Sequence, residues 1–299
     1  MKNLLITGST GFIGKKLVKK LVKNYNVWCL VRSYQNSTNK NVRYIEHNLS
    51  YDIPIINLPN NIDTVIHLIS SDKYRSFPNY AYETFKVNTS STAFLLDWSH
   101  KIGVKNFIFA STGGLYGNYN KPIKEDFPFK YKLDEKISYY FCNKEISEKL
   151  CKIYDKILNI TILRIFYPYG PEQDANFLIP RIIKKIKEKE LIKIQGKQGM
   201  SFNPIYIDDA IDLLNEIISS EIKGTFNISG SYKTNLLEII NIISKHLKIK
   251  PKIEITPESS PNMIADISNT AKILQKRFVN IEKGIFETLK LKKNNENKL

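Results

Sequence analysis

The sequence predicts an α/β fold built on a doubly wound parallel sheet, and three observations support that prediction. Short runs of apolar or β-branched residues alternate with longer segments in which apolar residues recur at helical spacing. The short runs are almost continuously apolar, which is typical of parallel strands buried on both faces. A glycine-rich turn joins the first run to the first helical segment. Together these features predict repeated strand and helix units around a parallel sheet.

The first half of the chain supplies most of the predicted sheet. An apolar run at 4–6 is followed by apolar residues at helical spacing over 12–22. Further elements follow the same alternation, with strands expected at 27–31, 42–46, 64–69, 107–110 and 160–163 and helices at 82–102 and 139–157. We therefore expect residues 1–170 to form one domain.

The second half is less regular and predicts a smaller domain. Its patterns indicate helices at 179–189, 209–219, 235–247 and 269–277, and strands at 191–194, 204–207 and 225–228. Residues 171–299 are expected to form most of this domain. The two domains are partly interleaved, because segments near 204–230 return to the first one. The polar end at 292–298 is expected to fray.

Composition and charge exclude several classes of protein. The 299 residues carry a formal net charge of +16, which would suit a nucleic-acid partner. Only six of the 45 basic residues are arginines, and the lysines are spread through every predicted helix without an aromatic stripe. A general lysine bias explains such a charge, so we expect no nucleic-acid partner. No stretch approaches the 18 apolar residues of a membrane span, so we expect no membrane partner.

The three cysteines point to a reducing compartment. Cys29, Cys142 and Cys151 show no Cys-x-x-Cys or Cys/His spacing, which argues against disulfides and against a zinc site. We therefore expect a cytoplasmic protein without a metal.

Three regularly spaced glycines follow the first strand. Gly8 allows a tight turn, Gly11 lets the backbone approach a pyrophosphate, and Gly14 lets the helix pack against the strand. The helix N-terminus that follows favours phosphate charge. We therefore predict a Rossmann-type dinucleotide-binding domain at 1–170, whose cofactor contacts include this turn: Gly8, Thr10, Gly11, Phe12, Ile13 and Gly14.

The end of the second strand bears on the choice of dinucleotide. A carboxylate at this position suits the free ribose hydroxyl of NAD, whereas an arginine accommodates the extra phosphate of NADP. Arg32 and Ser33 lie at this strand end, and the chain contains no acidic residue before Glu46. This pattern favours NADP(H), with NAD(H) as the alternative. A surface arginine at a strand end would look the same.

A tyrosine and a lysine four residues apart are candidates for carbonyl chemistry. Tyr140 and Lys144 share one face of a predicted helix, and a nearby cation favours the phenolate of a tyrosine that moves protons. With 17 tyrosines and 39 lysines in the chain, about two such pairs arise by chance, and Tyr82 with Lys86 is a second one. The context favours Tyr140, because its helix follows the strand that ends near Thr112.

The order of these motifs resembles one family over nearly the whole chain. It is similar to the extended short-chain dehydrogenase/reductases of the NAD-dependent epimerase/dehydratase family, most of which modify nucleotide sugars. The stretches that carry the resemblance are the glycine turn, His67-Leu68-Ile69-Ser70, Val87-Asn88-Thr89, Ser111 to Gly117, Tyr140-Phe141-Cys142-Asn143-Lys144, Leu163 to Pro171, and Tyr206-Ile207-Asp208-Asp209.

The resemblance implies a role for each matching position. Tyr140 would act as the general acid and base, Lys144 would bind the nicotinamide ribose and lower the Tyr140 pKa, and Thr112 would hydrogen-bond the reacting oxygen. The further cofactor contacts that it implies are Asn48, Leu49, Leu68 and Asn88. A homodimer through the helices at 82–102 and 139–157 is also implied.

The chain departs from the family at two places. Dehydratases have an Asp-Glu pair just after the Thr112 position and decarboxylases have a Glu, whereas Gly113 and Gly114 stand here. The arginines that hold a sugar-nucleotide diphosphate are also missing. Their absence leaves Tyr167, Arg181 and Phe202 as the candidate substrate contacts, or else a substrate without a diphosphate.

The expected function is therefore an NAD(P)-dependent oxidoreductase acting on a sugar carbon of a nucleotide sugar, most simply a 4-keto-sugar reductase. The alternative is a nucleotide-sugar 4-epimerase of the UDP-hexose type with tightly bound NAD. A distant alternative is a non-catalytic module that senses a dinucleotide or binds nucleic acid. The sequence does not name the sugar, the nucleotide or the carbon.

Overall fold

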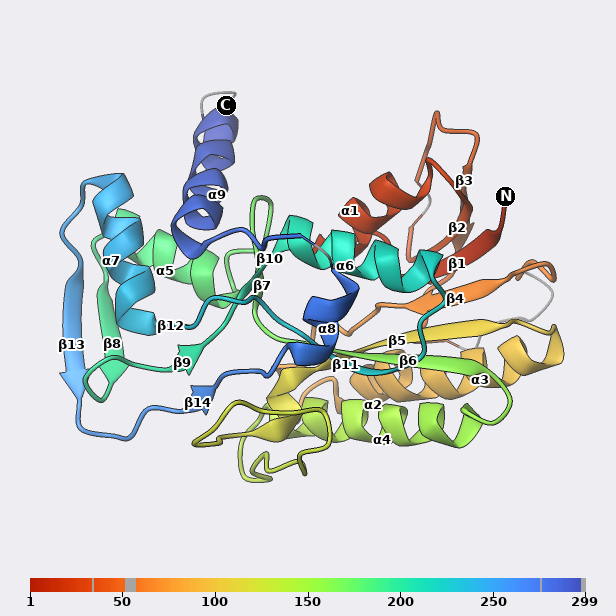
Figure 1. Ribbon diagram of the computed structural model, residues 1–299, viewed down its shortest axis with the longest axis horizontal. Coiled ribbons are helices and arrows are strands. Elements are labelled where there is room, and N and C mark those ends of the chain that lie inside the picture. Colours follow the sequence, from red (N-terminus) through yellow and green to blue (C-terminus); the bar gives the residue numbers. More distant parts are fainter. Residues whose placement is uncertain (34, 52–57, 275, 297–299) are drawn as a thin grey trace. The chain divides into compact units, whose positions relative to one another are not determined.

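The computed structural model describes residues 1–33, 35–51, 58–274 and 276–296, with 291–296 described by their backbone alone (Figure 1). The chain forms two compact units, each assembled from several segments. The first consists of Met1–Leu115, Lys130–Arg164 and Leu213–Phe226. The second consists of Tyr116–Phe129, Ile165–Asp212 and Asn227–Leu299.

A seven-stranded sheet in the order β11-β6-β5-β4-β1-β2-β3 is the centre of the first unit. Every pairing from β3 across to β5 is parallel. Leu4, Leu5 and Ile6 of β1 are completely buried, as expected of a central strand covered on both faces. The predicted doubly wound parallel sheet is thus confirmed. Its strands are β1 (Asn3–Thr7), β2 (Asn26–Val31), β3 (Val42–Glu46), β4 (Thr64–His67), β5 (Asn106–Thr112), β6 (Asn159–Ile165) and β11 (Gly224–Ile228).

Helices cover both faces of this sheet. In Figure 1, α3 and α4 run along one face and α1 lies on the other. The strand order reverses beside β1, because β2 follows on one side and β4 on the other, and ligands of such sheets bind at the carboxyl ends of the strands at this point. The helical segments are α1 (Phe12–Leu21), α2 (Ala81–Phe85), a π-helical turn η2 (Lys86–Ser90), α3 (Ser91–Lys101), a 3₁₀ turn η3 (Gly113–Tyr116), α4 (Ser138–Tyr154) and α6 (Ile207–Ser219), of which the part from Leu213 belongs to this unit.

The second unit contains short sheets packed with helices. Strand β13 pairs in parallel with β8, β9 pairs with both β12 and β14, and β7 pairs with β10. Helix α7 packs against α5 and α9. The elements are β7 (Pro168–Tyr169), α5 (Leu178–Lys187), β8 (Leu191–Gln195), β9 (Ser201–Phe202), β10 (Ile205–Tyr206), β12 (Thr234–Asn235), α7 (Leu236–Leu247), β13 (Lys252–Thr256), β14 (Asn262–Met263), α8 (Ser268–Ile273) and α9 (Ile281–Glu296).

Several elements of the second unit were not predicted from the sequence, among them the two-residue strands β7, β9, β12 and β14, strand β13 and helix α9. Strand β13 is short, and its five residues pair with β8, some 60 positions earlier in the chain. Helix α9 continues to Glu296, whereas the sequence predicts a frayed end from residue 292. Buried Ile285 and Leu289 anchor α9, so tertiary packing extends a helix whose last turns are polar. Residues 297–299 lie outside the described part of the chain.

No helix in the described part of the chain combines the length and apolar character needed to span a bilayer. The same residues contain no cluster of three or more His, Cys, Asp or Glu side chains arranged to hold a metal ion.

Candidate active site

The glycine turn lies at the carboxyl end of β1, and the chain packs so closely here that side chains are excluded. The Gly11 N–H donates to the Gly8 carbonyl oxygen at 3.0 Å, and Gly8 has a φ of +72°. A Cβ at Gly8 would lie 2.8 Å from the Ile69 nitrogen, and one at Gly14 only 2.1 Å from the Gly8 oxygen. Glycine at these two positions therefore lets β1, the segment after β4 and α1 meet.

The start of α1 fits the phosphates of a dinucleotide. Thr10 and Gly11 are exposed and Phe12 and Ile13 are half-buried, so the first amides of the helix are accessible. The first turn contains no acidic side chain that would compete for these amides. A free helix N-terminus carries partial positive charge and unpaired N–H groups, which together bind anions.

Asn88 lies in the π-helical turn η2, and its amide offers a donor beside the same sheet edge. Its Oδ1 accepts from the Ser71 N–H at 2.9 Å, and its carbonyl oxygen accepts from the hydroxyls of Thr92 and Ser147. Asn88 Nδ2 is buried and has no hydrogen-bond partner among the described residues. A buried unpaired donor is costly, which fits an acceptor supplied by a bound cofactor.

The other predicted cofactor contacts have different surroundings. Leu68 is half-buried, and its N–H donates to the Thr7 carbonyl oxygen at 3.2 Å. Asn48 Oδ1 accepts from the Ser50 N–H at 3.1 Å. Leu49 is 4% exposed and packs in the hydrophobic core of the unit, so its side chain serves the core.

Arg32 and Ser33 are exposed just after β2, and Arg32 has an acidic partner. Arg32 Nη1 lies 3.2 Å from Asp72 Oδ2, in the segment that follows β4. The sequence offers no acid near Arg32, but the fold brings one from 40 residues away. The guanidinium on which the NADP(H) prediction depends is therefore already paired with a carboxylate.

Helix α4 and strand β5 bring the three predicted catalytic residues together. Thr112 is the last residue of β5, and the Lys144 ammonium donates to the Ala110 carbonyl oxygen at 2.8 Å and to that of Ile69 at 3.4 Å. The Lys144 side chain is buried, and this burial lowers its pKa to about 8, while Cys151 and Glu148 nearby raise it.

Tyr140 lies 6.0 Å from the Lys144 ammonium, measured to the centre of its ring. Burial is the main reason that the pKa of the phenol is raised. Hydrogen bonding with Ser70 and Thr112, and the charge of Arg75, lower it. Tyr140 therefore keeps its proton in this state and has polar partners around its oxygen.

Two residues near Tyr140 were not predicted from the sequence. The ring of Tyr74 lies 4.8 Å from the ring of Tyr140, and the Arg75 guanidinium lies 5.1 Å from the ring of Tyr74. Both belong to the segment between β4 and α2, which has no periodic pattern. No signal in the sequence distinguishes them from ordinary loop residues.

The second tyrosine and lysine pair occupies a different environment. Tyr82 is 72% exposed, and the Lys86 ammonium lies 5.3 Å above its ring at the surface of α2 and η2. Tyr82 is thus exposed to water and is not placed beside the end of a strand, whereas Tyr140 is buried beside the end of β5. The sequence context therefore favoured the pair that meets β5.

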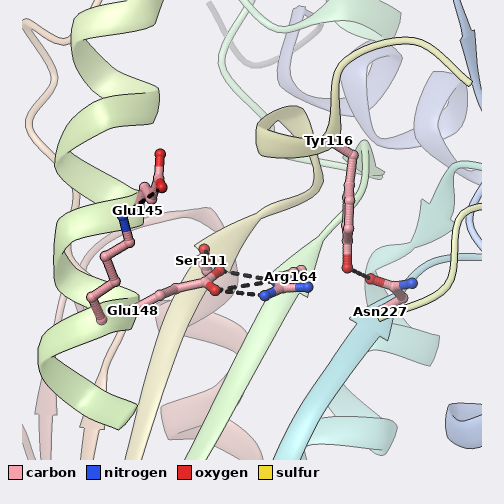
Figure 2. A network of polar contacts seen from close by, with 7 residues as sticks. Ser111, Tyr116, Glu145, Glu148, Arg164 and Asn227 are labelled. Carbon is pink, nitrogen blue, oxygen red and sulfur yellow. Dashed lines mark hydrogen bonds and ion pairs between the residues drawn. The ribbon is translucent and has the colours of Figure 1, made fainter. Parts of the chain in front are cut away.

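A buried polar network lies one helical turn beyond Lys144. Figure 2 shows Glu148 of α4 bonded to Ser111 of β5 and to Arg164 of β6. The ion pair measures 2.7 Å from Arg164 Nη2 to Glu148 Oε2, and both side chains are at most 3% exposed. Neither Glu148 nor Arg164 was predicted as a site residue, although Glu148 repeats the four-residue spacing that joins Tyr140 to Lys144.

The second unit contains the three predicted substrate contacts. Tyr167 has a φ of +43°, its hydroxyl donates to Met200 Sδ at 3.2 Å, and its ring meets that of Phe202 at 5.1 Å. Phe202 is completely buried, so its ring belongs to the core of the unit and supports Tyr167. Arg181 lies on the exposed side of α5.

Comparison with known proteins places these features in a family. Residues 4–229 match the NAD dependent epimerase/dehydratase family. The chain belongs to this family. The predicted family resemblance is confirmed, and so is the prediction of an enzyme of this family that depends on a nicotinamide dinucleotide. Nucleotide-sugar modification is the chemistry of the group.

Several relatives of this family match along most of their length. A UDP-N-acetyl-α-D-glucosaminuronate decarboxylase of Bacillus cytotoxicus is 30% identical, over 96% of this chain and 97% of the relative. A UDP-glucuronate 4-epimerase of Thermodesulfobacterium geofontis is 28% identical, over 97% and 96%. The solved structure of a UDP-glucuronic acid 4-epimerase from Bacillus cereus, bound to UDP-glucuronic acid and NAD, gives a TM-score of 0.85 at 26% identity, over 98% of this chain and 99% of that one.

Proposed function

We propose that this protein is a nucleotide-sugar 4-epimerase that uses and retains NAD and takes a UDP-hexose or UDP-hexuronate. Tyr140, Lys144 and Thr112 are its proposed catalytic residues. The observation that carries the proposal is the pair of glycines after Thr112, which stand where dehydratases and decarboxylases of the family have a carboxylate and beside which the Phe141 ring lies. The glycine turn, Asn88 and the segment after β4 are the proposed cofactor contacts.

A side chain at Gly114 would have to displace the Phe141 ring. A Cβ on this residue would lie 2.4 Å from Cε1 and 2.7 Å from Cζ of the Phe141 ring, which follows Tyr140 on α4. Dehydratases and decarboxylases of the family have a carboxylate in this stretch, because removing water or carbon dioxide needs further acid or base chemistry. A chain without that carboxylate is suited to oxidation and re-reduction of one carbon.

The relatives include both 4-epimerases and decarboxylases of UDP sugars. The Thermodesulfobacterium and Bacillus cereus proteins are 4-epimerases of UDP-glucuronic acid, and the latter is seen with NAD. The Bacillus cytotoxicus relative is a decarboxylase. The absence of a carboxylate after Thr112 is the reason to separate this chain from that decarboxylase.

The proposed mechanism assigns one task to each side chain. After the phenol has released its own proton to solvent, the Tyr140 oxygen takes the proton of the sugar hydroxyl during oxidation and returns it during reduction. The Thr112 hydroxyl hydrogen-bonds to the same sugar oxygen and orients it. The Lys144 charge stabilises the phenolate while Tyr140 is without its proton. When bound, NAD supplies the acceptor and donor of the hydride. Tyr167, Arg181 and Phe202 remain the proposed residues of the substrate side, with Phe202 acting through the ring of Tyr167.

A 4-keto-sugar reductase would use the same three catalytic residues. Its support in the sequence is Arg32, read as a contact for the extra phosphate of NADP(H). Because Arg32 is paired with Asp72, that support is weaker, and NAD(H) becomes the proposed cofactor. The homodimer and the cytoplasmic location stay predictions.

The test is the conversion of UDP-glucuronate and UDP-glucose to their C4 epimers by the purified protein, with and without Tyr140→Phe. The variant should lose about 10²- to 10⁴-fold in turnover, the usual contribution of a positioned acid or base. Tyr82→Phe is the matched control, because it removes the same oxygen from the other pair and should leave turnover unchanged.

A second measurement separates the epimerase from the reductase. Denaturing freshly purified protein should release close to one NAD per chain if the cofactor is retained through the reaction cycle. Protein that releases no nicotinamide, yet reduces a UDP-4-keto sugar with NADPH, would overturn the epimerase in favour of the reductase.

A further inference from the structure

A buried carboxylate lies next to the catalytic residues, yet the proposed mechanism does not use it. Glu148 is 1% exposed and stands four residues after Lys144 on the same face of α4. Arg164 Nε donates to both of its oxygens, at 3.0 and 3.2 Å, and Arg164 Nη2 donates to Oε2 at 2.7 Å. This two-pronged contact fixes the plane of the carboxylate.

The same carboxylate holds the end of β5. The Ser111 hydroxyl donates to Glu148 Oε1 at 2.5 Å (Figure 2). Ser111 stands between Ala110, whose carbonyl oxygen accepts from Lys144, and Thr112, which is hydrogen-bonded with Tyr140. A side chain that anchors Ser111 therefore controls the positions of both neighbours.

The charges around the Lys144 ammonium come from several elements. On α4, burial raises the pKa values of the Tyr140 phenol and the Cys151 thiol, so both are neutral. On β4, burial lowers the pKa of His67 to about 3, so this imidazole is neutral as well. On β6, Arg164 is positive and bound to Glu148. Among these described neighbours, Glu148 supplies the negative charge. Burial lowers the Lys144 pKa, while Cys151 and, to a smaller extent, Glu148 raise it.

A buried ion pair is a poor way to stabilise a fold. Removing two charges from water is costly, and replacing such a pair by apolar side chains of similar volume is often neutral or stabilising. Stability alone therefore does not explain why this ion pair is buried here. The contact of Glu148 with Ser111 and its place one turn from Lys144 suggest that the pair contributes to function.

We infer that Glu148 is a positioning residue of the catalytic site. Bound by Arg164, its carboxylate holds Ser111 and stands one helical turn from Lys144, so that Thr112 and Lys144 stay aligned with Tyr140. The inference rests on the proposed function only in taking Lys144 and Thr112 as catalytic.

The first experiment measures the Lys144 pKa directly, in intact protein labelled with [ε-¹³C]lysine and followed by NMR. With a pKa near 8, the Lys144 signal should titrate apart from those of ordinary lysines, and its absence from Lys144→Met assigns it. Glu148→Gln removes the negative charge and leaves Arg164, so it should lower the Lys144 pKa by about one unit. The double variant Glu148→Leu/Arg164→Met removes both charges and should fall between Glu148→Gln and the native protein.

Two further variants separate charge from anchoring. Glu148→Asp keeps the charge and should keep a Lys144 pKa close to the native value. Ser111→Ala keeps Glu148 and Arg164, so it should leave that pKa unchanged while lowering turnover about 3- to 10-fold, the equivalent of about one hydrogen bond. In Glu148→Gln, the alkaline limb of the pH profile of kcat/KM should move to lower pH along with the Lys144 pKa.

A purely structural role predicts another pattern. The urea midpoint would fall in the variants, but the Lys144 pKa would stay within 0.3 units (about 0.4 kcal/mol) of the native value in all of them, and that result would overturn the inference. If Glu148→Gln does not fold, the double variant Glu148→Leu/Arg164→Met decides, because it leaves no unpaired charge buried and should still lower the Lys144 pKa by more than 0.3 units. If the native protein turns over no UDP-sugar, the proposed function fails, whereas the order of Lys144 pKa values still tests the role of Glu148.

Discussion

Arg32 forms an ion pair with Asp72, which is 40 positions away in the sequence. Both side chains of the Arg32–Asp72 pair are more than half exposed, at 63% and 53%, so the pair adds little to stability. The pair instead weakens the attraction between Arg32 and any other anion that approaches it. A phosphate on the cofactor ribose would have to displace the Asp72 carboxylate and remain near its negative charge. Asp72 thus opposes the preference that Arg32 alone would create.

Changing Asp72→Asn should therefore shift cofactor preference at this one position. We expect the affinity of the NAD-stripped protein for NADP(H) to rise about 3- to 10-fold and that for NAD(H) to change less than about twofold, because only NADP(H) has the extra phosphate. Calorimetric titration of both cofactors measures the ratio. Asp97→Asn is the control, since it removes the same charge from the Lys101 pair on α3. An unchanged ratio in Asp72→Asn would show that the pair plays no part in cofactor choice.

At the scale of the element, the first turn of helix α1 packs tightly against the glycine turn that precedes it. Gly14 is buried in the third position of the helix, where alanine would ordinarily raise helix stability. The Gly8 carbonyl oxygen lies 2.1 Å from the site of a Cβ on Gly14, so the local preference and the tertiary contact conflict. Packing of the helix against the strand end decides in favour of glycine.

Substituting Gly14→Ala should lower the free energy of unfolding by about 1–3 kcal/mol, as expected for overpacking against backbone, and should also weaken NAD binding. Urea midpoints and calorimetry measure the two effects. Gly11→Ala is the graded companion: its Cβ would lie 3.3 Å from the same oxygen, a contact that a small shift relieves. Equal losses in the two variants would contradict the packing argument.

At the scale of the molecule, His67 couples the central sheet to α3. Its Nδ1 is 2.8 Å from the Thr7 hydroxyl of β1 and its Nε2 is 3.0 Å from the Thr92 hydroxyl of α3. Burial, and secondarily the charge of Lys144, lowers the His67 pKa to about 3. The unfolded chain takes up this proton near pH 6.5, whereas the folded protein does not until about pH 3.

Stability should therefore be fully present above pH 6.5 and fall as the pH drops towards 3. The contribution of one histidine is a slope of about 1.4 kcal/mol for each pH unit below its unfolded pKa, or about 2 kcal/mol at pH 5. Urea unfolding from pH 7 to pH 4 measures it. His67→Gln should flatten this part of the profile, whereas His100→Gln, at an exposed position, should leave the slope unchanged. A profile equally steep without His67 would assign the acid sensitivity to other groups.

Local patterns were sufficient for the elements that carry strong periodicity. The strands near Leu5, Val65 and Phe107 and the long helix of Tyr140 follow from runs and spacings of a few residues, which short-range sterics and burial dictate. Strand β13 and the extent of α9 did not follow, because each depends on a partner far along the chain. The boundary of the domains at residue 170 stays a prediction.

By itself, the sequence determined the glycine turn, the parallel sheet and the pairing of Tyr140 with Lys144 through its place after β5. Those features depend on backbone geometry and on residue spacing, which a linear pattern records. Only the tertiary structure decided which polar and charged side chains meet. Asp72 pairs with Arg32, Glu148 contacts Arg164 and Ser111, and Arg75 lies near Tyr140. Electrostatic interactions act through space between segments that the chain order separates, so the charged surroundings of Arg32 and Lys144 are set by folding.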